Sequence, residues 1–152
     1  MGTSAERAHR VLNPNDYRFR YTPDRIDTLL PDEIFVFGSN MAGRHGAGAA
    51  LLAKTRFGAK QGVGVGITGQ CYALPTKGFM IETLPLPAIR VGIENMIDCS
   101  RTQMSKCFLV TKIGCGLAGY SVSQIGELFI GIDLPVNVII SVEFDRERRR
   151  NQ

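Results

Sequence analysis

Two glycine-rich segments, residues 38–50 and 113–120, have the composition of anion-binding loops. Each follows a short apolar run and leads into a segment with helical spacing. Where a strand turns into a helix through glycines, unhindered backbone N–H groups and the helix N-terminus favour a negative charge, most often a phosphate. Two such loops in one small domain therefore predict a pyrophosphate clamp and a nucleotide-like ligand.

Two side chains within these loops have chemistry of their own. His45 is a candidate general acid or base, because histidine is the side chain that most readily exchanges a proton at neutral pH. A loop histidine more often serves as a simple hydrogen-bond donor. Cys115 stands before a predicted helix, where a thiolate is favoured. Because no histidine base is placed beside Cys115, we favour packing under the loop over a nucleophilic role.

The elements that must position these loops alternate along the chain. Buried strands are expected at 34–37, 71–74 (closed by Pro75), 107–111 and 137–144. Helices are expected at 47–57, from 85 to about 99, and from Ser121, where Gln124 completes a capping box. Alternation of strand and helix implies crossovers, so we expect a three-layer α/β/α fold around a mainly parallel sheet. Ligands of such sheets bind at the carboxyl ends of the strands.

Length and composition agree with one globular domain. The chain has 152 residues, of which 44% are hydrophobic and 21% charged, and no apolar run approaches the roughly 20 residues of a membrane span. We divide it into an irregular N-terminal arm at 1–20, a nucleotide-binding domain at 21–144 and a basic tail at 145–152. We expect a cytoplasmic protein without a membrane partner.

Charge and cysteine spacing argue against two other classes of function. The net charge of +4 comes largely from arginines near the two ends, which are usually solvated, so nucleic-acid binding through them is the less favoured alternative. The four cysteines lack the paired spacing of zinc ligands. We therefore expect reduced thiols, no metal and no cofactor.

One further glycine string, residues 64–69, matches the dinucleotide pattern G-x-G-x-x-G. That pattern belongs between a strand and the helix that follows it, whereas this string precedes a strand. We expect a mobile glycine-rich loop here.

The motifs resemble those of the macro domain family, which binds ADP-ribose. Gly38-Ser39-Asn40 at the end of a buried strand looks like that family's first ligand loop. The strings at 72–77 (Tyr-Ala-Leu-Pro-Thr-Lys) and 113–117 (Ile-Gly-Cys-Gly-Leu) resemble the branch of terminal ADP-ribose protein glycohydrolase. The matches occur in the same order as in that family and together span about residues 34–144.

The resemblance implies a role for each matching position. Asn40 would contact the distal ribose, with Gly46 and Gly48 lining its pocket, and Tyr120 would pack on that ribose or simply on the core. The acidic residue that would recognise the adenine is not assigned, and Asp16, Asp24 and Asp27 are the candidates. The implied ligand-binding set is Gly38, Ser39, Asn40, Gly46, Gly48, Gly114, Cys115, Gly116, Leu117, Ala118, Gly119 and Tyr120.

The resemblance also implies a catalytic lysine, with one departure from the pattern. Lys77 matches the glycohydrolase lysine that attacks the anomeric carbon, a role that needs a neutral amine. The family's acid/base aspartate is replaced by Ala118, which leaves His45 or Asp133 as substitutes. Three roles stay open for Lys77: a nucleophile assisted by Asn40, a residue that binds a ligand phosphate, or a solvated residue at the end of a strand. We expect the protein to bind ADP-ribose or a related NAD-derived nucleotide, either free or attached to a macromolecule. It would then either hydrolyse the ADP-ribosyl linkage or only read or sequester the nucleotide.

Overall fold

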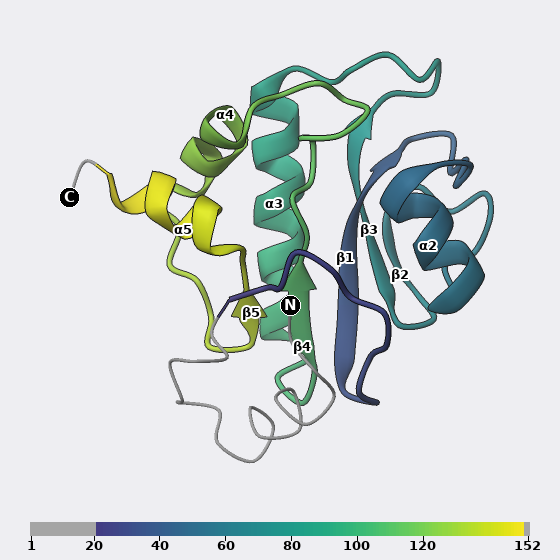
Figure 1. The fold of residues 1–152 in the computed structure, drawn as a ribbon, viewed down its shortest axis with the longest axis horizontal. Helices are drawn as coiled ribbons and strands as arrows, with labels where there is room; N and C mark the ends of the chain where they lie inside the picture. The colour runs from purple at the N-terminus through teal and green to yellow at the C-terminus, as the bar shows by residue number, and fades with distance from the viewer. Residues whose placement is uncertain (1–20, 151–152) are drawn as a thin grey trace.

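A five-stranded mixed sheet forms the centre of the computed structural model, which describes residues 21–150 (Figure 1). The strand order is β2-β3-β1-β4-β5, and only β2 runs antiparallel to its neighbour. The strands are β1 (Glu33–Asn40), β2 (Gly66–Thr68), β3 (Cys71–Lys77), β4 (Cys107–Val110) and β5 (Val138–Ile139).

Helices cover both faces of this sheet, so the α/β architecture and its mainly parallel order are as expected from sequence. The helices are α2 (Gly48–Arg56), α3 (Leu86–Arg101), α4 (Val122–Gly126), the 3-10 turn η2 (Glu127–Phe129) and α5 (Val142–Arg149). Figure 1 shows α2 on one side of the sheet and α3, α4 and α5 on the other. No helix within residues 21–150 combines the length and apolar character needed to cross a bilayer.

The side chains of β1 alternate between two apolar cores. Phe35 and Phe37 join the core beneath α2, whereas Ile34 and Val36 join the core shared with α3, α4 and α5. Successive strand residues point to opposite faces, so a continuous apolar run is what a strand between two helical layers requires. This alternation produces the three layers, and the strand order places β1 at the centre of the sheet.

Two predicted helices begin where the sequence indicates. In α3, Pro85 is the N-cap and the stripe of Ile89, Ile93, Met96 and Ile97 is buried. At α4, Ser121 and Gln124 form the expected capping box, with both reciprocal hydrogen bonds present. Strand β3 runs two residues past Pro75. Proline is tolerated there because the pairing with the antiparallel strand β2 does not extend beyond Ala73, which faces Gly66, the first residue of β2.

The C-terminal region differs from its prediction. Of the strand expected at 137–144, only Val138–Ile139 is formed, and α5 starts at Val142 after Ser141 accepts a hydrogen bond from the amide of Phe144. The segment taken as a basic tail is therefore largely helical, and its Asp145 is buried. The arm predicted for residues 1–20 lies outside the described residues.

The glycine string at 64–69 is also more ordered than expected. Residues Gly66–Thr68 form β2, and the hydroxyl of Ser39 donates a 2.5 Å hydrogen bond to the carbonyl of Gly64. A β-carbon at Gly64 would lie 2.3 Å from the carbonyl oxygen of Asn40. Glycine is required there because two backbones touch, and not because the segment must move.

Candidate functional site

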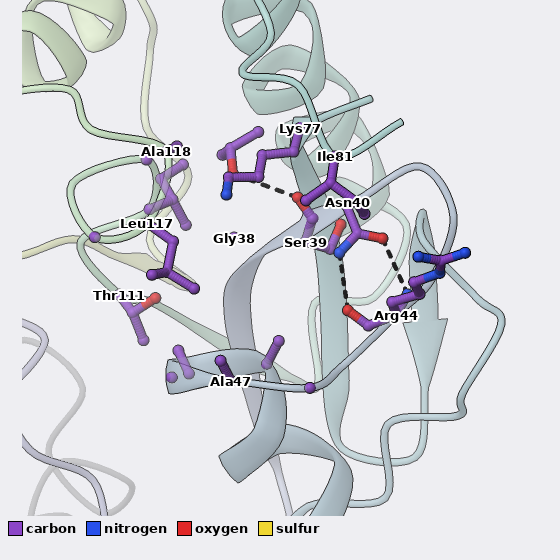
Figure 2. A pocket seen from close by; sticks show the side chains of 18 of the residues that line it. Gly38, Ser39, Asn40, Arg44, Ala47, Lys77, Ile81, Thr111, Leu117 and Ala118 are labelled. Carbon is purple, nitrogen blue, oxygen red and sulfur yellow. Dashed lines mark hydrogen bonds between the residues drawn. The ribbon is translucent and has the colours of Figure 1, made fainter. Parts of the chain in front are cut away.

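A cavity of about 510 Å³ opens at the carboxyl ends of β1, β3 and β4 (Figure 2). This is the edge of the sheet at which ligands of parallel α/β folds bind. Ten of the residues predicted from sequence line it: Gly38, Ser39, Asn40, Gly46, Gly48, Lys77, Gly114, Gly116, Leu117 and Ala118. The fold thus brings both glycine loops and the end of β3 to one hollow.

The N-terminus of α2 forms one wall of the cavity. Its N-cap is Ala47, which offers no side-chain oxygen to the first turn, and that turn contains no acidic residue. Gly48, Ala49 and Ala50 all line the cavity. The first N–H groups of a helix have no partner within the helix, and together with the helix dipole they favour an anion. This nine-residue helix therefore presents an uncapped positive end to the hollow.

The loop after β4 forms the opposite wall. Its turn is closed by two hydrogen bonds to loop carbonyls: Gly119 N–H to Gly116 and Tyr120 N–H to Gly114, both 3.0 Å. The N–H groups of Gly116, Leu117 and Ala118 donate to no acceptor within residues 21–150. A β-carbon at Gly116 would meet nothing within 4 Å, so the backbone here is open to a ligand.

The charged residues that line the cavity, Arg44, Lys77 and Lys112, are all cationic. Figure 2 shows the Lys77 amine directed into the hollow and the Arg44 guanidinium directed away from it. Lys112 is paired with Glu143 and, at 3.1 Å, with Asp24, and these two carboxylates raise the pKa of its ammonium group. Lys77 is therefore the cation best placed to meet a ligand.

Asn40 lines the cavity, but its amide also has a structural task. Its Oδ1 accepts from the backbone N–H of Arg44 at 2.9 Å, and its Nδ2 donates to the carbonyl of Arg44 at 2.8 Å. Both ends of the side chain thus close the first glycine loop (Figure 2). An amide nitrogen has two hydrogens, so one remains for a ligand hydroxyl.

His45 does not face the cavity. Its side chain is fully buried, packs edge-on against Phe37, and places Nε2 3.1 Å from the carbonyl oxygens of both Lys60 and Val63. It ties the first glycine loop to the following segment. These contacts support the role of a hydrogen-bonding loop histidine and do not support a general acid or base.

Three predicted residues of the second loop also lie off the lining. The Cys115 amide bonds the carbonyl of Lys112, and burial raises the pKa of its thiol to about 11, which opposes a nucleophilic thiolate. The Tyr120 hydroxyl donates to the carbonyl of Leu84 at 2.6 Å, so its ring packs on the core and does not face the hollow. Gly119 contributes the left-handed turn that follows, with φ of 88°.

Two of the candidate acids lie in a neighbouring cavity of about 370 Å³. Asp24 and Asp27 line it, and it shares Ala49 and Thr111 with the first cavity. Asp16 lies outside the described residues. Asp133 lines neither cavity, so it is not placed to replace the aspartate absent at Ala118.

The other nine lining residues were not predicted as site residues. Six of them lie within the motifs read from the sequence, whereas Ile81, Thr111 and Lys112 lie outside every motif. Thr111 and Lys112 stand between the end of β4 and the second glycine loop, and that position was a usable signal. Ile81 had none, because its place depends on the hairpin that follows β3.

No protein-family model, curated protein or solved structure matches this chain. The resemblance to the macro domain family therefore rests on the three short motifs, and the function must be argued from the cavity.

Proposed function

We propose that the protein binds ADP-ribose or a closely related NAD-derived nucleotide in the cavity between the two glycine loops. The observation that carries this is the pair of anion-binding walls. The uncapped N-terminus of α2 and the open amides of Gly116, Leu117 and Ala118 face one hollow, and its charged lining residues are all cationic. A diphosphate is the group that offers oxygens to both walls.

The size of the two adjoining cavities supports a ligand larger than a phosphate. Volumes of about 510 and 370 Å³ lie in the range of small-molecule sites. The diphosphate would occupy the first, with the distal sugar toward Lys77. The base would lie in the second, where Asp24 and Asp27 can accept hydrogen bonds from an exocyclic amine.

The lining favours binding without turnover. Hydrolysis of an ADP-ribosyl linkage needs a group that transfers a proton, and neither a carboxylate nor a histidine lines the first cavity. Position 118, where the resembling glycohydrolases carry their aspartate, is an alanine whose carbonyl accepts from the hydroxyl of Thr83. We therefore favour a reader or sequestering protein over a hydrolase that uses Lys77.

Calorimetric titration with ADP-ribose tests the proposal, using Gly116→Ala and Gly116→Val as graded variants. Their side chains enter open space, so the fold should persist while phosphate oxygens lose access to the amides. We expect micromolar binding by the wild type, weakened by Gly116→Ala and at least tenfold by Gly116→Val, with unchanged melting temperatures. Absence of wild-type binding would refute the proposal. Oligonucleotide binding that is insensitive to Gly116→Val would support the nucleic-acid alternative instead.

A further inference from the structure

The hairpin after β3 carries a backbone conformation that its sequence does not favour. The amide of Ile81 donates to the carbonyl of Gly78, the amide of Gly78 donates to the carbonyl of Glu82, and Ile81 has φ of 64°. In hairpins of this form the residue after the turn is left-handed and normally glycine. Ile81 is the only non-glycine residue within 21–150 with positive φ, and for a β-branched side chain this is a strained state.

The hairpin hydrogen bonds maintain this conformation and so keep the Ile81 side chain at the cavity. Ile81 lines the hollow, and Figure 2 shows it pointing toward the Ser39–Asn40 end of β1, across from Leu117, with the Lys77 amine between them. Leu117 also lines the hollow while 72% exposed.

The hairpin is connected to the opposite loop. The hydroxyl of Thr83 donates to the carbonyl of Ala118 at 3.0 Å, and Thr83 pairs with Lys77 as an antiparallel bridge. The tip itself is steadied by Glu82, whose carboxylate accepts from the amide of Met80. Ile81 and Leu117 thus belong to one hydrogen-bonded frame around the Lys77 end of the cavity.

We propose that Ile81 is a specificity-determining residue that, with Leu117, packs on a ring attached beyond the diphosphate. The inference rests on the proposed function and adds to it the residues that select for the second ring. Contact with two aliphatic side chains does not stabilise bound phosphate oxygens, whereas it buries the apolar face of a sugar or an aromatic ring and so stabilises its binding. The site therefore prefers a nucleoside diphosphate that carries a second ring, such as ADP-ribose, over ADP itself.

The test compares ADP-ribose and ADP as ligands of the wild type and of Ile81→Gly. Glycine accepts the left-handed backbone and removes the side chain, so the variant should melt at the same temperature or roughly 2–4 °C higher. We expect its affinity for ADP-ribose to fall about tenfold, toward that for ADP, while its affinity for ADP is unchanged. Leu117→Ala should show the same selectivity loss.

Met80→Gly is the matched control, since Met80 is in the same hairpin, is 86% exposed and does not line the cavity. It should leave both affinities unchanged. Equal losses for ADP and ADP-ribose in Ile81→Gly, or no loss for either, would overturn the role of Ile81 while leaving nucleotide binding in place. If the wild type binds neither ligand, the proposed function itself fails, and this inference with it.

Discussion

At the scale of single residues, Lys77 and Ala118 decide between a binding protein and a hydrolase. Lys77 presents its amine to the cavity, but the hollow contains no carboxylate or imidazole that could move a proton for it. An ammonium in this place is suited to a ligand oxygen, because hydrogen bonds to charged groups are stronger than neutral ones. The proposed function therefore assigns Lys77 to ligand binding and not to nucleophilic attack.

Replacing Lys77 with methionine should weaken ADP-ribose binding about 10- to 150-fold, because a charge-assisted contact contributes roughly 1.5–3 kcal/mol. Calorimetry would measure it, with Lys60→Met as control, since Lys60 is exposed and does not line the cavity. Mass analysis of an ADP-ribosylated peptide should show no release by either protein. Release by the wild type that Lys77→Met abolishes would make the protein a hydrolase.

At the scale of elements, α5 is the main departure from the sequence prediction. The sequence predicts a strand that ends at Phe144 and a solvated tail from Asp145, yet one helix crosses this boundary. Within it Phe144 is fully buried and stacks on Phe129, with ring centroids 5.5 Å apart. The arginines pair within the helix, as Arg148 and Arg149 both do with Asp145. The hydroxyl of Tyr21 also reaches Asp145, so α5 holds the first described segment of the chain.

Phe144→Ala should lower the free energy of unfolding by about 3–5 kcal/mol, the usual cost of emptying a buried phenylalanine site. Urea denaturation at neutral pH would measure the change. Val142→Ala, in the same helix but 38% exposed, should cost less than about 1 kcal/mol. Equal, small effects of both substitutions would mean that α5 does not pack on the core through Phe144.

At the scale of the whole molecule, two buried acidic side chains should make the folded state less stable at alkaline pH. Burial raises the pKa of the Cys71 thiol to about 12 and that of the Tyr72 phenol to about 12. In the unfolded chain these groups ionise nearer their ordinary pKa values of 9.0 and 10.0. Between these limits the unfolded state loses protons that the folded state keeps, so stability falls as pH rises.

We expect the free energy of unfolding to be flat in this respect below pH 9 and to decrease from there toward pH 12. Each unit of pKa difference corresponds to about 1.4 kcal/mol. Urea titrations at pH 8 and pH 10.5 would show the loss, and Cys71→Ala should make it smaller by removing one of the groups. An unchanged slope in Cys71→Ala would show that this thiol is not the source.

Much of the architecture follows from the order of residues alone. Ile34 to Phe37 form a continuous apolar run, which only a strand covered on both faces can bury, and the stripe in α3 has a helical period. Ser121 and Gln124 specify a helix start through bonds only three residues apart. Local patterns of this kind also placed both glycine loops at the end of the sheet where the cavity lies.

The tertiary structure decided what depends on segments distant in sequence. Whether His45 faces the cavity or the core depends on the carbonyls of Lys60 and Val63. Whether the C-terminal segment packs as a helix depends on the contact of Phe144 with Phe129. Ile81 enters the cavity only because hairpin hydrogen bonds impose a left-handed backbone on it. Periodicity and capping act within a few residues, whereas burial and side-chain direction are properties of the packed molecule. These properties determine which candidate residues line the cavity.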